Sequence, residues 1–424
     1  MTHKLKDLYP TQSDVDVDNP DGTFKNDVVA GDKTGTPLER TWQRNVWGFL
    51  SHILKKAFIV PDATEENESK SQYFEGLQRL FTTENLHSLP FEMIPEGLRA
   101  DIGLRWKVTD FGSDVSYVLC FCNLGNGVIL CGTSETSGAG IYRSVDYGET
   151  WKKINVSFTY PVTSTYCFEC LGDGIILAGV GGLSQSGAIY KSTDNGLTWN
   201  HVLVLAGLDT IESLSNLGNG IVLAGAGAQD GDGDVYKSIN YGDTWVKKEL
   251  GAGLNVVSAI ENLGNGTVLA GTRGFSGEGD IYKSINYGDT FSQIEIGATI
   301  NSVNAIKYLG GQIVLLGTGS DVNDGDIYKS YNKGDTWAKV EMGAQLEYIW
   351  CIEKIPGGVL CGAGASSGDG DIYKSIDEGD TWTLIEMGID LESIYALIYI
   401  GNGEVLAGAA EDPGDGDVYK STVY

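Results

Sequence analysis

The sequence is poor in positive charge, and it contains no long apolar run. Lysine and arginine total 29 against 57 aspartate and glutamate, which gives a formal net charge of −28. Such a surface repels phosphate, so nucleic acid and anionic membranes are poor partners. The absence of a run of about 18 apolar residues argues against membrane insertion. The first ten residues lack the basic and apolar regions of a signal peptide, so synthesis in the cytoplasm is expected.

Glycine is abundant, and the sequence repeats itself. Segments of the type Ile-Tyr-Lys-Ser-x-Asn-Tyr-Gly-Asp-Thr-Trp recur every 45 to 48 residues, and their tyrosines are Tyr142, Tyr190, Tyr236, Tyr282, Tyr328, Tyr373 and Tyr419. A period in the forties, with short apolar runs between tight turns, is typical of one four-stranded blade per unit. The predicted fold is an all-β seven-bladed β-propeller with a small N-terminal α-helical anchoring domain.

The last repeat is incomplete, because the chain stops at Tyr424 before the expected tryptophan. The segment around Trp106 resembles the missing strand, and Trp106 precedes Tyr142 by 36 residues, close to the 37 between Trp245 and Tyr282. Residues 104–109 are therefore predicted to pair with the C-terminal blade and close a propeller domain of residues 104–424. Closure protects sheet edges that would otherwise pair with other chains.

Each repeat is predicted to contain four strands, for example residues 302–309, 312–317, 325–330 and 336–340. Gly-Asn-Gly turns, such as Gly218 to Gly220, separate the first two strands of several repeats. A two-residue type I′ hairpin turn requires positive φ at both central residues, which Asn-Gly readily adopts.

A Ser-x-Asp/Asn-x-Gly-x-Thr-Trp turn follows the third strand. Its short polar residue is Asp146, Asp194, Asn240, Asn286, Asn332 or Asp377. This motif resembles the Asp box of sialidase-like (BNR-repeat) propellers, and the resemblance covers residues 104–424. A structural role is expected, because the side chain can accept backbone N–H groups of its own turn. Asparagine in half of the turns supports this role, since acid–base chemistry would not tolerate the amide.

Cysteine and histidine offer little chemistry. Of the seven cysteines, Cys131 and Cys361 occupy a position held by alanine, such as Ala224, in other repeats. Buried small hydrophobic residues are expected, with a disulfide or metal role as the alternative. His201 is the only histidine in the repeats, so Ser-His and metal-His machinery is not expected there.

The first hundred residues differ from the repeats. Residues 1–35 are predicted to form an extended acidic arm. Thr36-Pro37-Leu38-Glu39 predicts a helix start, because an N-cap threonine, a proline and a glutamate follow in order. Apolar residues at helical spacing predict one helix to about residue 57 and a second over residues 71–81, forming a helical domain of residues 36–81. Residues 82–103 are predicted to be a linker.

Three segments of this region resemble the N-terminal anchoring region of tail-fibre proteins from tailed bacteriophages. They are Gly31 to Leu38, Trp47-Gly48-Phe49-Leu50 and Ser71 to Leu77. The resemblance implies a virion tail component whose N-terminal helices attach to other tail proteins. It also implies a homo-oligomer, frequently a trimer. Many such fibres continue as fibrous β-structure, whereas a propeller is predicted here.

One position of the predicted inner strand varies without rule among the repeats. This position lies five residues before the leucine or isoleucine that precedes the first turn. The residues found there are Leu119, Tyr166, Glu212, Ser258, Asn304, Trp350 and Tyr395. Near the channel mouth, Trp350, Tyr395, Tyr348 and Tyr166 would offer stacking surfaces, and Glu212 and Asn304 polar contacts. The predicted ligand is a host-surface receptor, a glycan or a protein. The alternative is that the aromatic residues plug the channel.

The loops that enter the third strand are acidic, as in Asp230, Asp232 and Asp234. Alternating aspartate and glycine suits calcium, because glycine lets several carboxylates converge. Solvated loop tips are the alternative, and no other cofactor is expected.

Two enzymatic interpretations differ in the residues that they require. Sialidase chemistry needs an arginine cluster, and residues 104–424 contain only Arg105, Arg143 and Arg273. A polysaccharide depolymerase needs two carboxylates about 5 to 10 Å apart. Glu212 with Glu347 or Glu392 would be candidates. Binding without turnover is the first interpretation, and a depolymerase or a purely structural tail component are the alternatives.

Overall fold

In the computed structural model, the chain divides into two units, Met1–Ile94 and Pro95–Tyr424. In the first unit, β1 (Ser13–Asp14) pairs antiparallel with β2 (Thr23–Phe24). The predicted arm, the helical domain at 36–81 and the linker otherwise lie outside the described residues. The described residues are 13–14, 23–24, 106–109, 111, 114–159, 161–182, 186–204, 207–227, 233–251, 254–274, 279–296, 300–319, 325–342, 346–364, 370–385, 387, 391–401, 403–410 and 416–421.

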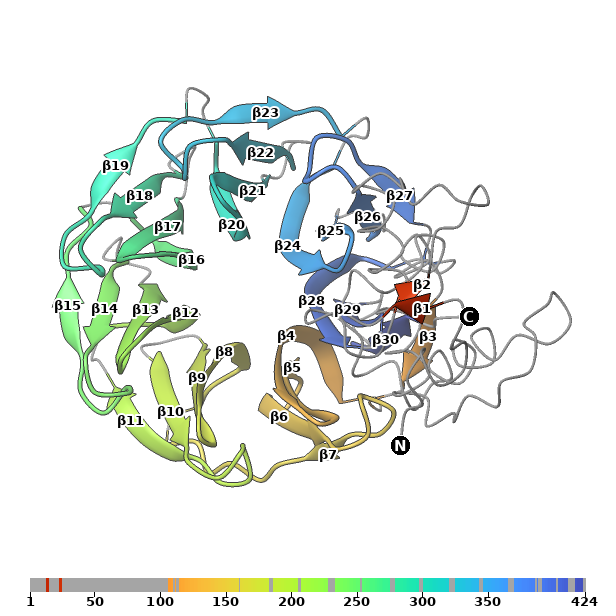
Figure 1. Ribbon diagram of the computed structural model, residues 1–424. Helices are drawn as coiled ribbons and strands as arrows, with labels where there is room; N and C mark the ends of the chain where they lie inside the picture. The colour runs from red at the N-terminus through yellow and green to blue at the C-terminus, as the bar shows by residue number, and fades with distance from the viewer. Residues whose placement is uncertain are drawn as a thin grey trace, which may run out of the picture. The chain divides into compact units, whose positions relative to one another are not determined.

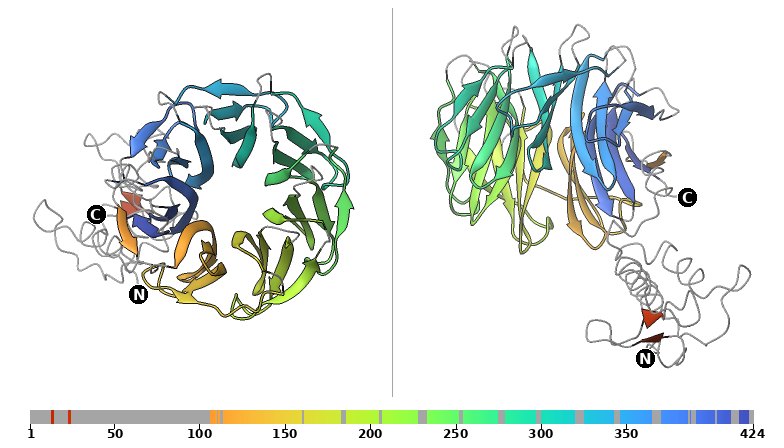
Figure 2. Two further views of the ribbon diagram at one scale, coloured as in Figure 1. Left: turned by 180° about the vertical axis from the view of Figure 1, so that it is seen from behind. Right: turned by 45° about the horizontal axis from the view of Figure 1, so that its top comes forward.

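The second unit is all-β and propeller-like over its described residues. Successive groups of four antiparallel strands surround a central axis, with the first strand of each group nearest to the axis (Figures 1 and 2). We call each group a repeat unit. A single residue pair, such as Gly227 with Val256, joins the second strand of one repeat unit to the first strand of the next. No helix that could span a membrane is found among the described residues.

The first repeat units follow one another along the chain. They are β4 (Val115–Gly125), β5 (Val128–Glu135), β6 (Gly138–Ser144) and β7 (Lys152–Lys153); β8 (Ser164–Gly172), β9 (Ile175–Gly181), β10 (Ala188–Ser192) and β11 (Asn200–Val204); β12 (Thr210–Gly218), β13 (Ile221–Gly227), β14 (Val235–Ser238) and β15 (Val246–Lys248); and β16 (Val256–Gly264), β17 (Thr267–Arg273), β18 (Ile281–Ser284) and β19 (Ser292–Ile294).

The remaining repeat units continue around the ring. They are β20 (Ser302–Gly310), β21 (Ile313–Gly319), β22 (Ile327–Ser330) and β23 (Ala338–Val340); β24 (Tyr348–Ile355), β25 (Gly358–Gly364), β26 (Ile372–Ser375) and β27 (Thr383–Ile385); and β28 (Ser393–Gly401), β29 (Glu404–Ala410) and β30 (Val418–Ser421) with β3 (Trp106–Thr109). The strand β3 pairs antiparallel with β30, from Trp106 opposite Ser421 to Thr109 opposite Val418.

The second strand of each repeat unit is the centre of the core. In β13, for example, Val222, Leu223 and Ala224 are fully buried, because the strand is covered on both faces. Apolar clusters extend across neighbouring repeat units: one cluster joins Leu269 of β17 to Leu316 of β21. The apolar packing between neighbouring repeat units thus helps to hold the ring together.

The Ser-x-Asp/Asn turns keep the same hydrogen-bond partners with either residue, although the bond with the threonine hydroxyl reverses its direction. In one turn, Asp146 Oδ1 accepts the backbone N–H of Thr150 at 2.9 Å, and Oδ2 accepts the Thr150 hydroxyl at 2.5 Å. In another, Asn240 Oδ1 accepts the backbone N–H of Thr244 at 2.9 Å, and Nδ2 donates to the Thr244 hydroxyl at 2.9 Å. The threonine hydroxyl can donate or accept, which explains why aspartate and asparagine interchange.

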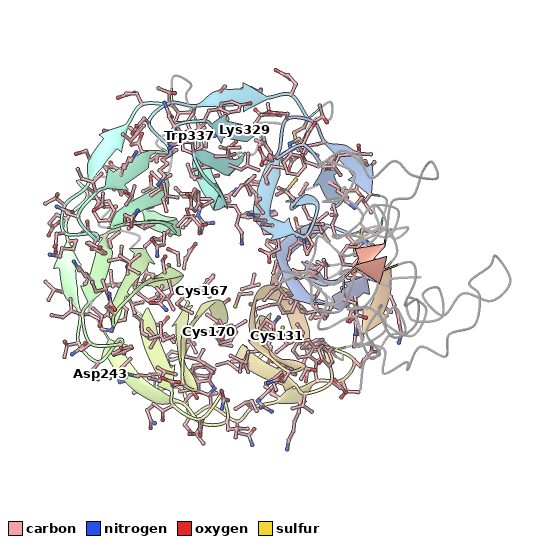
Figure 3. The ribbon with its side chains drawn as sticks, viewed as in Figure 1. Cys131, Cys167, Cys170, Asp243, Lys329 and Trp337 are labelled. Carbon is pink, nitrogen blue, oxygen red and sulfur yellow. A yellow bond between two sulfur atoms is a disulfide. The ribbon has the colours of Figure 1, made fainter. Side chains whose placement is uncertain are left out.

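Lysines of the third strands form ion pairs between neighbouring repeat units. Lys329 Nζ lies 2.7 Å from Asp380 of the next unit, and its side chain is 1% exposed. Lys191 reaches Asp243 at 2.6 Å, and Asp243 lies at the outer edge of the ring (Figure 3). Lys420 Nζ reaches Glu149 at 2.8 Å, which links the last repeat unit to the first. These pairs follow the circumference and support the closure made by β3.

The expectation that the cysteines are small buried residues holds only in part. Cys131 and Cys361 are fully buried, and burial raises the pKa of both thiols, as expected for small core residues. Cys122 of β4 and Cys170 of β8, however, form a disulfide between neighbouring repeat units (Figure 3). Their spacing of 48 residues reflects the repeat, so no local sequence motif signalled the bond.

One interruption of the ion-pair pattern generates a stability prediction. Arg143 donates from Nε to the Asn195 carbonyl at 3.2 Å, but Leu197 occupies the position of the acidic partner and is 53% exposed. Leu197→Asp should therefore stabilise the protein by about 0.2 to 1 kcal/mol, measured by urea unfolding at low salt. Leu197→Asn is the control without charge. Equal stability of the two variants would contradict the proposed ion pair.

The turns also generate a prediction for acid stability. Burial alone would raise the pKa of Asp377, but hydrogen bonds from Thr381, Ser375 and backbone N–H groups lower it to about 2. A carboxylate with a depressed pKa stabilises the fold above its unfolded pKa of about 3.9, and this contribution is lost as pH falls toward 2. Asp377→Asn should keep the stability at pH 7 and lose less of it between pH 4 and 2. Identical pH profiles in urea unfolding would show that the carboxylate contributes nothing.

Candidate functional site

A β-bulge recurs at one position in the innermost strand of each repeat unit. In β12, Ile211 pairs with Ala226 and Ser213 pairs with Gly225, so Glu212 is the extra residue. A bulge leaves one residue outside the ladder and re-aims its side chain. The bulged residues are Leu119, Tyr166, Glu212, Ser258, Asn304, Trp350 and Tyr395.

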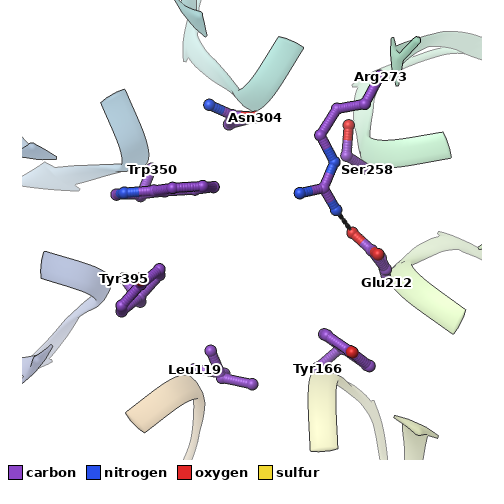
Figure 4. Close-up of a pocket in the computed structure, with 8 residues that line it drawn as sticks. All are labelled: Leu119, Tyr166, Glu212, Ser258, Arg273, Asn304, Trp350 and Tyr395. Carbon is purple, nitrogen blue, oxygen red and sulfur yellow. Dashed lines mark hydrogen bonds and ion pairs between the residues drawn. The ribbon is translucent and has the colours of Figure 1, made fainter. Parts of the chain in front are cut away.

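All of these bulged residues line one pocket, together with Arg273 from the end of β17 (Figure 4). Its volume is about 210 Å³. This is below the range of about 300 to 1,000 Å³ typical of drug-sized ligands. The space suits one ring-sized chemical group. The structure thus brings together five of the residues predicted from sequence, which are Tyr166, Glu212, Asn304, Trp350 and Tyr395.

Aromatic rings form one side of the pocket. Trp350 and Tyr395 lie 5.1 Å apart between ring centroids at an interplanar angle of 41°. Tyr348, also predicted from sequence, is outside the lining but stacks on Trp350 at 4.6 Å and 16°. Tyr117 packs edge-on against Tyr395 at 5.6 Å. Because Trp350 and Tyr395 are each packed against a second ring, this aromatic wall is held in place before any ligand arrives.

Polar side chains form the opposite side. The guanidinium of Arg273 forms an ion pair with Glu212 Oε2 (Figure 4). The side chain of Arg273 is 32% exposed and that of Glu212 is 13% exposed. Burial lowers the pKa of Arg273, but a guanidinium remains charged at any pH at which the protein folds. Nearby, the Ser258 hydroxyl donates to the Val303 carbonyl at 2.5 Å, so it is already engaged by the backbone.

Asn304 lies between the two sides with its hydrogen-bonding capacity unused. Its Oδ1 and Nδ2 atoms are buried, and neither has a hydrogen-bond partner among the described residues. A buried amide without partners is destabilising. Packing therefore does not explain why this residue is asparagine.

A second set of charged residues lies three positions further along the same strands. Lys307 Nζ lies 2.6 Å from Glu353 Oε2, and Glu261 accepts the backbone N–H of Tyr308 at 2.8 Å. Burial, with the nearby charge of Glu261, raises the pKa of Glu169 to about 8. Glu169 therefore keeps its proton at neutral pH, and this region carries less negative charge than its sequence suggests.

Arg273 was not predicted to line the pocket, although the sequence contains a signal for this role. Its register equivalents are glycine in four other repeat units, as in Gly227, Gly319 and Gly364, and they are Ser134 and Ala410 in the remaining two. A Cβ on Gly319 would lie 2.4 Å from the Tyr348 ring, so packing requires glycine there. Arginine at this position is thus an exception that packing of the repeat does not demand. Comparison of the second strands, rather than the innermost strands alone, would have identified it.

The predicted calcium ligands are only partly described. Asp234 is fully buried. Its Oδ2 lies 2.7 Å from Lys247 Nζ, and Oδ1 accepts the backbone N–H of Leu250 at 2.9 Å. Asp230 and Asp232 lie outside the described residues. Where side chains are described, no group of three metal-ligating residues occurs.

Comparison with known proteins defines the class of the fold. No family model matches the chain, and no curated protein matches it. Solved structures do match: YCF48 bound to D1 peptide has a TM-score of 0.55 at 14% identity, covering 75% of this chain and 97% of that one. The WD40 β-propeller domain of Doa1 has a TM-score of 0.53 at 14% identity, covering 75% and 97%.

A third similar structure is the GH74 enzyme of Niastella koreensis. Its TM-score is 0.52 at 15% identity, and the match covers 73% of this chain and 52% of that enzyme. Structural neighbours of this chain are therefore β-propellers, and at these identities the likeness concerns the fold alone.

The orphaned amide of Asn304 generates a prediction. In the preceding repeat unit, Ser258 occupies the same bulge, and its hydroxyl donates to the Val303 carbonyl on the innermost strand of the next unit. Asn304→Ser should therefore raise the free energy of unfolding by about 1 kcal/mol, because it replaces an unpaired amide with a paired hydroxyl. Urea unfolding measures the change, and Asn304→Ala should give a smaller gain. A loss of stability in the serine variant would show that packing dictates the asparagine.

Proposed function

We propose that this chain is a bacteriophage virion tail protein whose seven-bladed propeller binds a host-surface glycan in the bulge-lined pocket. The observation that carries the binding proposal is the polarised lining, with Trp350 and Tyr395 on one side and Glu212 with Arg273 on the other. A pyranose ring has a matching asymmetry, since one face is apolar and its hydroxyls form hydrogen bonds at the edge. Aromatic stacking and charge-assisted hydrogen bonds would then act together.

The tail location rests on the N-terminal sequence segments that resemble tail-fibre anchoring regions, such as Trp47-Gly48-Phe49-Leu50. In this proposal, helices over residues 36–81 attach the chain to other tail proteins, frequently as a trimer. The turns of the Asp-box type stabilise the propeller and take no part in binding.

Glycan binding without turnover is preferred over hydrolysis because of the carboxylate count in the pocket. Hydrolases with paired carboxylates need a second carboxylate about 5 to 10 Å from the first. Among the described residues that line the pocket, Glu212 is the only carboxylate, and Arg273 engages it. Glu347 and Glu392, the partners suggested by sequence, do not line it. A polysaccharide-degrading activity like that of GH74 enzymes is the alternative, and host glycan shortened by the purified protein would establish it.

The proposal predicts that binding depends on the aromatic wall. Trp350→Ala combined with Tyr395→Ala should weaken binding of the full chain to host-surface glycan by tenfold or more, because two stacking surfaces are lost. Titration with purified glycan measures the affinity, and adsorption of particles that carry the variant measures the consequence.

Tyr331→Ala is the matched control, because Tyr331 is an aromatic residue that is 58% exposed and lies outside the pocket. Circular dichroism checks that all variants fold. Unchanged affinity in the double variant would remove the pocket from the proposal. If the wild-type chain binds no host envelope material, a purely structural tail component is favoured instead.

A further inference from the structure

Two residues distinguish one sector of the pocket from the rest of the ring. Glu212 is the only charged residue among the bulged positions, and Arg273 stands where four other repeat units have glycine and the remaining two have Ser134 and Ala410. The two come from neighbouring repeat units and form an ion pair. Because each departs from the repeat and each is paired with the other, the pair is a single feature that packing of the ring does not require.

The ion pair makes the pocket electrically neutral within a strongly acidic chain. The remaining lining residues are uncharged, so Glu212 and Arg273 balance each other, while the whole chain carries a formal net charge of −28. An anionic ligand therefore meets an unfavourable field on approach and no excess positive charge on arrival.

The pair retains hydrogen-bonding capacity that faces the cavity. A guanidinium has five N–H donors, and in Figure 4 the end of Arg273 that is not bonded to Glu212 points across the pocket toward Trp350. The other carboxylate oxygen, Glu212 Oε1, accepts one long bond from the Thr210 hydroxyl at 3.3 Å. A donor and an acceptor thus lie next to each other, in an orientation fixed by their own ion pair.

We propose that the Glu212–Arg273 pair recognises two adjacent hydroxyls of a neutral sugar and discriminates against sugars that carry a carboxylate. One hydroxyl donates to Glu212, and its neighbour accepts from Arg273. This inference rests on the proposed function, because it assumes that the pocket holds a sugar ring against Trp350.

An acidic sugar fits this arrangement poorly for a local reason as well. Its carboxylate would be attracted to Arg273 and would then lie beside the carboxylate of Glu212. Two adjacent carboxylates repel each other strongly in a partly desolvated site. Release of Arg273 from Glu212 would leave a largely buried carboxylate unpaired, which is also unfavourable. A neutral diol leaves the ion pair intact and meets neither penalty.

The test uses the full chain and matched pairs of methyl glycosides. Glucose with glucuronic acid and galactose with galacturonic acid differ by one carboxylate, and calorimetric titration at pH 7 measures each affinity. The neutral member of a pair should bind at least tenfold more tightly. If the acidic members bind as well as the neutral ones, the inference is wrong and glycan binding stands. If no member of the panel binds, both the inference and the proposed function are overturned.

Three variants separate recognition from a merely structural role. Glu212→Ser introduces the residue found at the Ser258 bulge, and Arg273→Gly introduces the glycine of four other repeat units, so both substitutions suit the fold. Glu212→Ser frees Arg273 and should invert the preference toward the uronic acid. Arg273→Gly should weaken binding of the neutral sugar at least tenfold without improving that of the acid.

The variant that carries both substitutions should bind neutral and acidic members with equal, weak affinity, since no charge remains in the pocket to distinguish them. Circular dichroism confirms folding of each variant. An unchanged preference in Glu212→Ser would overturn the inference, because a pair that only holds two repeat units together has no means of setting charge selectivity.

Discussion

The bulge at one recurring position of each innermost strand is the constraint on which the pocket depends. A regular strand would alternate its side chains between the two faces of the sheet, and both faces are buried against neighbouring repeat units. The bulge releases one residue from the ladder in each unit. Because the bulge recurs in every repeat unit, the released residues form a circle of side chains whose types are not determined by packing. Tyr166, Glu212 and Trp350 can therefore differ while the strands around them remain alike.

Residues that stabilise the ring and residues that line the pocket are consequently separated. Second strands such as β13 are buried and nearly invariant in type, and the turns hold their geometry with either aspartate or asparagine. Ion pairs such as Lys329 with Asp380 repeat at the circumference. The unpaired amide of Asn304 and the arginine at the end of β17 belong instead to the pocket, where local rules of packing and pairing are broken. Such departures concentrate at functional sites.

Periodicity made much of the ring predictable from sequence. The strands β20 to β23 begin and end within two residues of the expected ranges, and Asn219 and Gly220 have the positive φ values that their turn requires. Comparing repeats also identified the variable position that lines the pocket. Arg273 was missed because it lies on a different strand, and the Cys122–Cys170 bond was missed because its partners belong to separate repeat units. Single residues that break a repeat are visible only when every strand is compared.

The central claim is that the pocket beside Trp350 holds a sugar ring. The most direct measurement is the NMR signal of the Trp350 indole N–H in the full chain, assigned by its loss in Trp350→Phe, during titration with purified host-surface glycan. The expected result is a saturable shift of this signal, with most other indole signals unchanged. A Trp350 signal that stays unchanged while the glycan binds elsewhere, or that does not respond at saturating glycan, would contradict the claim.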